Sequence, residues 1–304
     1  MVPGLLENKI AIVTGAAHGI GRGHALELAK HGATVVVADL GTSVRGEGQG
    51  TDAQQVADLI VKRGGTAIAD FADVGDEDQC AALVDRAVAE FGRLDVVVNN
   101  AGIARDKVIW NMSAADFDAV MRVHVRGTWL MTHFAARHWR ERAQRGETFT
   151  GRVINTTSGA GLSGNFGQSN YATAKAAIVG LTLTTSLELA RFGVTVNAVG
   201  PGGMTRLTAT IGGDRQAFEP DDLAEDEYHP MDPAGSSPLV AWLASDEAQY
   251  VSGQVIRAIH DKIYLMGGWR EIATISSGEK RWDATRLGQL MGTDIFHTRA
   301  PGLG

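Results

Sequence analysis

The stretch from Lys9 to Gly32, KIAIVTGAAHGIGRGHALELAKHG, decides the fold of this 304-residue chain. Its first residues, Lys9 to Thr14, form a short apolar run, and the apolar residues after the run recur with helical spacing. The order of strand, glycine loop and helix is typical of the first unit of an α/β fold. The loop glycines Gly15, Gly19 and Gly21 allow a tight turn and let backbone N–H groups approach a phosphate at the helix N-terminus.

The same alternation continues along the chain and predicts one large α/β domain. We expect further strands at residues 34–39, 66–73, 94–98, 152–157 and 194–199 and a last one at either VIRAI or KIYLM, and further helices at 52–63, 76–91, 114–145, 171–193 and 239–244. The run TVVVAD at residues 34–39 is uninterrupted, as expected for a parallel strand covered on both faces. The prediction is a single-domain Rossmann-like, doubly wound parallel sheet of about seven strands, with helices on both faces.

Composition excludes several classes of protein. No apolar run reaches the roughly 18 residues needed to span a bilayer, and the N-terminus lacks a secretory pattern, so we expect a cytoplasmic protein with no membrane partner. A net charge of -7 provides no basic footprint for nucleic acid. Nine histidines without paired cysteines or an H-E-x-x-H spacing indicate no metal site. The one cysteine, Cys80, is predicted to be a small core residue rather than a nucleophile.

The stretch from Ser158 to Lys175, SGAGLSGNFGQSNYATAK, has the residues of a catalytic centre. Tyr171 and Lys175 are four residues apart in a helical pattern, so both should project from one face. An ammonium about 4 Å from the phenol would favour the phenolate by about 4 kcal/mol, which lowers the tyrosine pKa by roughly three units at most. Ser158, at the end of an apolar run, could hold a substrate oxygen. The alternative is an ordinary buried helix face.

Several residues at the ends of the expected strands could contact a dinucleotide. Asp39 follows the second strand, where a carboxylate can accept hydrogen bonds from both adenosine ribose hydroxyls and repel a 2′-phosphate. This favours NAD over NADP, although a loop aspartate without a ligand is the alternative. Asp73 and Val74 could frame the adenine, and the cluster Asn99 to Gly102 lies where open α/β sheets bind their ligands.

Together, these motifs resemble the short-chain dehydrogenase/reductase family in type, order and spacing over about residues 8–265. The resemblance implies an NAD-dependent oxidoreductase in which Ser158 orients the substrate oxygen, Tyr171 is the acid/base, and Lys175 tunes Tyr171 and binds the nicotinamide ribose. It implies that NAD contacts Gly15, His18, Gly19, Ile20, Gly21, Asp39, Asp73, Val74, Asn100, Ala101, Gly102, Tyr171, Lys175, Pro201, Gly202 and Thr205. Thr205 departs from the pattern, because it follows Pro201 by four residues where the family has five.

A second departure indicates a subfamily. Where many members have V-N-x-x-G, this chain has Val123 to Gly127, VHVRG, so His124 replaces the fourth catalytic residue, an asparagine. We expect His124 to hold a water or a backbone carbonyl that relays protons from Lys175; a hydrogen-bonded core histidine is the alternative. This pattern and GNFGQSNY at residues 164–171 resemble the (3R)-hydroxyacyl-CoA dehydrogenase modules of type 2 peroxisomal multifunctional enzymes. The resemblance implies oxidation of 3-hydroxyacyl-CoA, with a fatty or steroid side chain, by a stand-alone relative of these modules.

Two other functions stay open: a 3-oxoacyl-carrier reductase or other steroid or alcohol dehydrogenase on the same scaffold, and a non-catalytic NAD-binding sensor or scaffold. Three cations, Arg105, Lys107 and Arg206, are candidates for binding CoA phosphates. We expect residues 1–269 to form the catalytic domain, with a lid at about 204–238 whose acidic residues face solvent, and residues 270–304 to pack on the body or on a partner subunit. The helices at 114–145 and 171–192 resemble the family's usual interface, which implies a homodimer or homotetramer.

Overall fold

The structure is a computed structural model that describes residues 4–209, 216–223, 227–278 and 280–296. The chain divides into two compact units, Met1–Met266 and Gly267–Gly304, and each is considered by itself. The second unit contains the short helix α10 (Ala284–Leu290), which begins where the Asp283 carboxylate accepts a hydrogen bond from the backbone N–H of Arg286. The first unit holds the sheet and every site residue predicted from the sequence.

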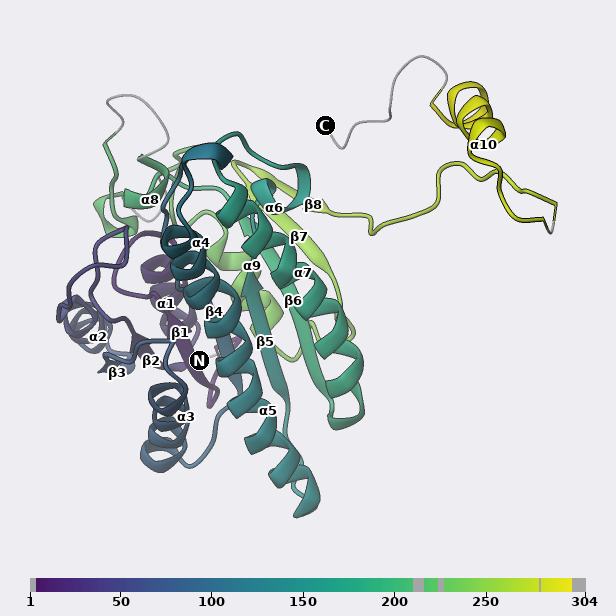
Figure 1. Cartoon of the computed structure of the whole chain (residues 1–304). Coiled ribbons are helices and arrows are strands. Elements are labelled where there is room, and N and C mark those ends of the chain that lie inside the picture. Colours follow the sequence, from purple (N-terminus) through teal and green to yellow (C-terminus); the bar gives the residue numbers. More distant parts are fainter. Residues whose placement is uncertain (1–3, 210–215, 224–226, 279, 297–304) are drawn as a thin grey trace. The chain divides into compact units, whose positions relative to one another are not determined.

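The first unit is built on one sheet with the strand order β3-β2-β1-β4-β5-β6-β7-β8 (Figure 1). The strands are β1 (Ile10–Thr14), β2 (Thr34–Ala38), β3 (Thr66–Asp70), β4 (Val96–Asn99), β5 (Gly151–Thr156), β6 (Val194–Pro201), β7 (Val255–Ile259) and β8 (Lys262–Leu265). Neighbouring strands run parallel except β7 and β8, which are antiparallel. The winding reverses between β1 and β4, and open α/β sheets bind their ligands at the carboxyl ends of the strands beside such a reversal.

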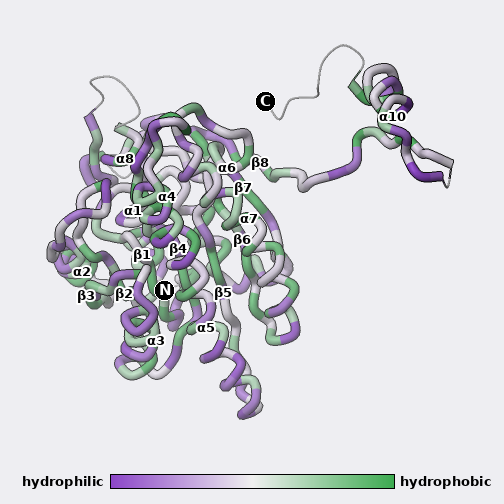
Figure 2. The backbone as a smooth tube through the Cα atoms, in the orientation of Figure 1, coloured by the Kyte–Doolittle hydropathy of each residue, from purple (hydrophilic) through white to green (hydrophobic). Residues whose placement is uncertain are grey.

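Helices cover both faces of this sheet. The helices of the first unit are α1 (Gly19–Lys30), α2 (Asp52–Lys62), α3 (Glu77–Phe91), α4 (Ala114–Met121), α5 (Gly127–Gln144), α6 (Gly159–Ser163), α7 (Ser169–Leu189), α8 (Arg206–Ala209) and α9 (Ser237–Ala244). One core cluster joins the sheet to α1, α2 and α9, and a second joins it to α3, α5 and the end of α7. Hydrophobic residues follow the central strands, as Figure 2 shows. The prediction of a doubly wound α/β fold is confirmed.

The last strand was predicted as one of two alternatives, and both segments form strands. VIRAI is β7 and KIYL is β8, so the sheet has eight strands in the part of the chain that the structure describes. A hairpin joins them, and His260 adopts the left-handed conformation in its turn, with φ 56°. The third strand is shorter than predicted and ends at Asp70, because the Asp70 carboxylate accepts a hydrogen bond from the backbone N–H of Ala72 and turns the chain.

The long helix predicted at residues 114–145 is interrupted by a π-helical segment, Arg122–Arg126, between α4 and α5. Such π-turns are frequent at functional sites, and this one carries His124. Cys80 lies on the buried face of α3, where burial raises its pKa to about 12, so the prediction of a structural cysteine is confirmed. Among the described residues, no helix has the length and apolar character required to cross a bilayer.

Candidate active site

The glycine loop between β1 and α1 is held by the residues that follow β4. The Thr14 hydroxyl accepts a hydrogen bond from the backbone N–H of Asn100 at 3.0 Å. The Asn100 side-chain amide donates to the carbonyl oxygens of Thr14 and Gly15, at 3.1 and 2.9 Å. A Cβ on Gly21 would overlap the Gly15 carbonyl oxygen, so the turn accepts no side chain there. Two separated sequence motifs therefore form a single rigid loop.

The N-terminus of α1 holds an oxyanion. The Glu219 carboxylate accepts a hydrogen bond from the backbone N–H of Gly19 at 2.6 Å, and its other oxygen lies 2.7 Å from Nδ1 of His18. This hydrogen bond is the largest cause of a raised His18 pKa. A helix N-terminus favours negative charge, and the Glu219 oxygen stands in for a phosphate oxygen. The loop therefore fits the pyrophosphate of a dinucleotide.

These and further contacts of residues 216–223 correct, for the Glu219 and Asp221 side chains, the prediction that the acidic residues of the expected lid face solvent, whereas Asp222 and Glu227 are exposed as predicted. Glu219 has the two contacts just described, and Asp221 accepts two hydrogen bonds from the Arg22 guanidinium, at 2.6 and 2.7 Å. Both acids are drawn onto α1, because its N-terminal N–H groups and Arg22 offer positive charge. Residues 210–215 and 224–226 of the expected lid lie outside the described residues.

Asp39 lies at the end of β2 and fits the ribose of a dinucleotide. Its two oxygens accept hydrogen bonds from the backbone N–H groups of Ala17 and Gly41, at 3.0 and 2.8 Å. A carboxylate has about four lone-pair sites, so acceptor capacity remains on the side that lines the cavity. Among the described residues from 40 to 51, no lysine or arginine lines the cavity. A 2′-phosphate would therefore meet the negative charge of Asp39, and no lysine or arginine from residues 40–51 lines the cavity to offset it.

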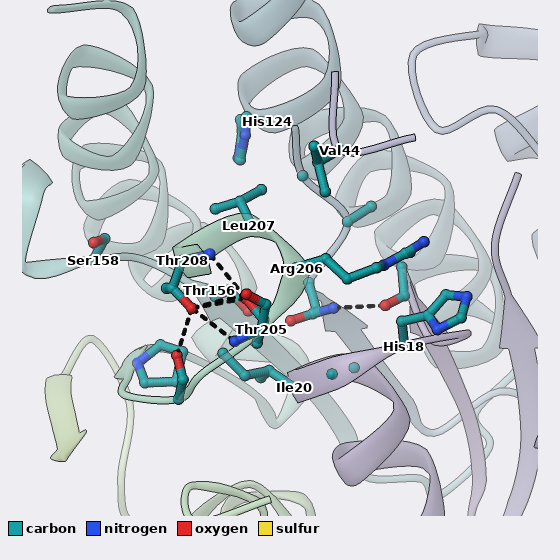
Figure 3. A pocket seen from close by; sticks show the side chains of 18 of the residues that line it. His18, Ile20, Val44, His124, Thr156, Ser158, Thr205, Arg206, Leu207 and Thr208 are labelled. Carbon is teal, nitrogen blue, oxygen red and sulfur yellow. Dashed lines mark hydrogen bonds between the residues drawn. The ribbon is translucent and has the colours of Figure 1, made fainter. Parts of the chain in front are cut away.

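All the site residues predicted from the sequence line one cavity of about 440 Å³ at the carboxyl ends of the strands. They are Gly15, His18, Gly19, Ile20, Gly21, Asp39, Asp73, Val74, Asn100, Ala101, Gly102, His124, Ser158, Tyr171, Lys175, Pro201, Gly202 and Thr205. Figure 3 shows side chains from widely separated parts of the chain around this space, among them His18 and Ile20 of the glycine loop, Ser158 after β5 and Thr205 to Thr208.

Tyr171 and Lys175 project from the same face of α7. The Lys175 ammonium lies 5.5 Å from the centroid of the Tyr171 ring and donates a hydrogen bond to the Thr156 carbonyl oxygen at 2.7 Å. The Ser158 hydroxyl forms a hydrogen bond with the phenol. The three predicted catalytic side chains therefore converge at the junction of β5 and α7.

The predicted effect of Lys175 on Tyr171 is wrong for this structure. Burial raises the pKa of Tyr171 to about 12, and only the hydrogen bond with Ser158 lowers it. Burial also lowers the pKa of Lys175 to about 7. A fully charged lysine in a medium of dielectric near 20 would lower the phenol pKa, but the sheet and helices remove water from both groups. Desolvation disfavours phenolate and ammonium alike.

His124 is fully buried between Tyr171 and the loop after β4. Its Nε2 lies 2.8 Å from the carbonyl oxygen of Ile103 and 3.1 Å from the backbone nitrogen of the same residue. The imidazole packs edge-on against the Tyr171 ring, with 5.2 Å between the centroids. Burial, assisted by the charge of Lys175, lowers its pKa to about 3, so the ring is neutral. The backbone carbonyl contact agrees with the expected geometry, while Nδ1 is buried without a hydrogen-bond partner among the described residues.

The stretch before Tyr171 is tied to the loop after β4. Gln168 donates a hydrogen bond to the Asp106 carboxylate at 2.6 Å, and the Asn170 amide donates to the Arg105 carbonyl oxygen at 2.9 Å. Two of the cations proposed for CoA phosphates belong to this region, but both Arg105 and Lys107 pair with Asp116, at 3.6 and 2.8 Å. Neither lines the cavity, whereas the third candidate, Arg206, does.

Several residues at the cavity were not predicted from the sequence, and three of them affect its shape or charge. Thr208 accepts a hydrogen bond from the backbone N–H of Thr205 at 2.7 Å and so shapes the loop after β6. Glu219 caps the glycine loop, and Arg257 enters the cavity from β7. Only Arg257 left a usable signal, because a charged residue in the middle of the apolar strand VIRAI requires an explanation.

Comparisons with known proteins agree with this geometry. A family model described as short chain dehydrogenase matches residues 9–216. Hydroxyacyl-CoA dehydrogenase ChsB1 of Mycobacterium tuberculosis is 39% identical over 302 residues, which cover 97% of this chain and 91% of that protein. Peroxisomal multifunctional enzyme type 2 of Mus musculus is 35% identical over 280 residues, which cover 92% of this chain and 33% of the mouse protein. The crystal structure of a short chain dehydrogenase from Mycobacterium avium has a TM-score of 0.86 at 42% identity and covers 98% of each chain.

Proposed function

The chain belongs to the short-chain dehydrogenase/reductase family and is an oxidoreductase, and on that premise we propose that it oxidises 3-hydroxyacyl-CoA to 3-oxoacyl-CoA with NAD. One observation carries the proposal: Ser158, Tyr171 and Lys175 converge on the same cavity as the glycine loop and Asp39. The acyl-CoA substrate is supported by the similarity to a hydroxyacyl-CoA dehydrogenase over almost the whole chain.

NAD would be held by the glycine loop at its pyrophosphate and by Asp39 at its adenosine ribose. When bound, it supplies the hydride acceptor. The residues after β3 and β4, Asp73 and Asn100 among them, would line the rest of its site. The preference for NAD over NADP rests on the Asp39 carboxylate and on the lack of a lysine or arginine that lines the cavity among the described residues 40–51.

The catalytic residues position the substrate and move its proton. Ser158 would hold the reacting oxygen, and Tyr171 would exchange a proton with it within hydrogen-bonding reach. With a pKa of about 12, Tyr171 is protonated at neutral pH, which is the form that donates a proton to a ketone. Alcohol oxidation uses the phenolate, and the hydrogen bond with Ser158 favours that form. His124, neutral and bonded to the Ile103 backbone, would orient the Tyr171 ring.

The test is NADH formation by the purified protein with 3-hydroxyacyl-CoA thioesters, steroid alcohols and plain secondary alcohols, each offered with NAD and with NADP. We expect the highest kcat/KM for a 3-hydroxyacyl-CoA with NAD. Tighter binding of NADP would contradict the cofactor assignment and favour a reductase. Binding of NAD without turnover of any substrate would favour a non-catalytic sensor.

We also propose that the protein is a homo-oligomer assembled through α5 and α7. Trp129 on α5 and Leu183 and Leu187 on α7 expose 47%, 43% and 80% of their surfaces. The two leucines are four residues apart and therefore share one helix face. Light scattering after size exclusion should show a dimer or tetramer, and Leu187→Glu should shift it toward the monomer. A monomeric wild-type protein would contradict this assembly.

A further inference from the structure

Arg257 is a charged side chain inside the sheet that the proposed mechanism does not use. It lies in the middle of β7, where its Cα pairs with Gly200 of β6. Its Nε is buried and has no hydrogen-bond partner, and no ion pair is found for its guanidinium among the described residues. A buried donor without a partner is destabilising, and native proteins rarely keep one without a reason. Arg257 also lines the cavity, so a ligand can supply the missing acceptor.

Two glycines place this guanidinium beside the catalytic serine. A Cβ on Gly200 would lie 3.1 Å from Cγ of Arg257, so the glycine makes room for the arginine stem. A Cβ on Gly159, the residue after Ser158, would lie 2.9 Å from an NH2 nitrogen of Arg257. The head of Arg257 therefore occupies the space next to Ser158 that a side chain at position 159 would fill.

The nearby part of the cavity holds no carboxylate that could neutralise Arg257. Among the described residues, the acids that line the cavity are Asp39 and Asp73, which follow β2 and β3. Four strands separate β2 from β7, which is about 24 Å at the usual strand spacing. Asp73 is also engaged by Arg122 at 2.7 Å. The free donors of Arg257 thus face a site in which Ser158 and Tyr171 are set to hold a substrate oxygen.

We propose that Arg257 is a specificity-determining residue that donates hydrogen bonds to a second oxygen of the substrate. This oxygen is the carbonyl of a 3-hydroxyacyl thioester, whose reacting hydroxyl is held by Ser158 and Tyr171. The proposal rests on the proposed function and deepens it, because it explains why a β-hydroxycarbonyl compound is preferred over a plain alcohol. A guanidinium suits this role since it stays charged and offers several donors in a fixed plane.

The experiment compares substrates with and without the second oxygen. The kcat/KM values are measured for 3-hydroxybutyryl-CoA, its N-acetylcysteamine thioester, methyl 3-hydroxybutyrate and 2-pentanol, with wild type, Arg257→Met and Arg257→Lys. Loss of hydrogen bonds from a charged donor should lower kcat/KM for both thioesters and the ester by about 10- to 100-fold more than for 2-pentanol. Arg257→Lys should recover part of this difference. The dissociation constant of NAD, measured for each variant, reports whether the fold is intact.

The matched control is Arg206→Met, which removes the other cavity-lining arginine, near His18. Arg206→Met should change kcat/KM for the methyl ester and for 2-pentanol by similar factors. The proposal would be overturned if Arg257→Met lowered kcat/KM equally for all four substrates, or lowered it for none of them. A loss confined to the CoA thioester would assign Arg257 to a CoA phosphate and would also overturn it. If wild type oxidises the methyl ester but neither thioester, the proposed function fails, and the ester and 2-pentanol still decide the role of Arg257.

Discussion

The two ends of the cavity present different kinds of chemical group to a ligand. At the glycine-loop end, the groups aimed at a ligand are backbone N–H groups and the carboxylate of Asp39, all held by short hydrogen bonds. At the catalytic end, they are the side chains of Lys175 and His124, which are buried, and of Tyr171, which is partly buried. The first end recognises shape and charge at its rim, while the second sets protonation states by burial. Changes at the two ends should therefore affect different quantities.

The largest effect should come from the catalytic end. Tyr171→Phe removes the proton-exchanging hydroxyl and should lower kcat by about 10²- to 10⁴-fold, the usual contribution of one acid/base group. Binding of NAD, measured by quenching of protein fluorescence, should change little, because the glycine loop and Asp39 are untouched. Ser158→Ala is the matched control, since it removes the hydroxyl partner of the phenol and leaves the phenol in place. A Tyr171→Phe protein with more than a tenth of wild-type kcat would show that the proton has another route.

The second effect belongs to the glycine-loop end and should leave kcat nearly unchanged. Asp39→Asn removes the charge of the carboxylate while keeping one acceptor oxygen for the loop. It should weaken NAD binding by about 10- to 150-fold, the range for a lost charge-assisted hydrogen bond, and narrow the gap between NAD and NADP. The measurement is a titration with each nucleotide.

Asp73→Asn is the matched control for Asp39→Asn, because Asp73 is the other cavity carboxylate and is paired with Arg122. It should change the ratio of NAD to NADP affinity far less. If Asp39→Asn leaves that ratio as it is in wild type, the carboxylate does not discriminate between the nucleotides, and the functional distinction between the two ends disappears.

The same contrast explains what could be predicted from the sequence. The glycine loop, Asp39 and the strand ends follow from local spacing, because a strand, a turn and a helix adjacent in sequence bind a phosphate in only a few ways. Ser158, Tyr171 and Lys175 line one cavity, as the sequence predicted, since only the short helix α6 separates β5 from α7 along the chain. These elements lie close to one another along the chain or in the regular order of the sheet.

The protonation states and the long-range contacts could not be predicted in this way. The pKa values of Tyr171 and Lys175 depend on how completely the sheet and both helix layers exclude water, which no short segment encodes. Glu219 reaches Gly19 across 200 positions of sequence, so no local pattern links them. Arg257 interrupts an apolar strand, and only the parallel pairing of Arg257 with Gly200 shows that its stem has room to turn into the cavity.

A third, smaller effect is the loss of stability at low pH that two buried histidines, one near each end of the cavity, should cause. His24 on α1 and His124 in the π-helical segment both have their pKa lowered from 6.5 to about 3 by burial. Below pH 6.5 the unfolded chain binds protons that these folded histidines do not, so stability falls as the pH falls toward 3. At pH 5 each histidine should cost about 2 kcal/mol relative to neutral pH.

Urea unfolding at pH 7 and pH 5 measures this loss of stability. His24→Gln and His124→Asn should each reduce the difference between the two pH values by about 2 kcal/mol, and the double variant by about twice that, because the two sites are far apart in sequence and packing. If one variant keeps the full wild-type difference, its histidine is protonated in the folded protein and water reaches that side of the core. The difference between the two variants would then show which of the two histidines is reached by water.

The smallest effect concerns the contact between residues 216–223 and the glycine loop. The Glu219 carboxylate occupies the Gly19 N–H that a pyrophosphate would use, so it competes with NAD for the same donor. Glu219→Gln replaces a charged acceptor by a neutral one and weakens the competitor. The apparent dissociation constant of NAD should fall by about 3- to 10-fold, because a larger fraction of the protein has the donor free.

Asp52→Asn is the matched control for this competition, because Asp52 contacts the other nitrogen of His18, at 3.0 Å, and has no contact with Gly19. Both substitutions remove one negative charge beside the same histidine, so a general electrostatic gain in NAD affinity would be equal in the two variants. The gain in NAD affinity of Glu219→Gln beyond that of Asp52→Asn measures the competition between Glu219 and NAD for the Gly19 N–H. Weaker NAD binding by Glu219→Gln would show instead that Glu219 supports the bound state, and the glycine-loop end would then depend on the Glu219 side chain as well as on its own backbone.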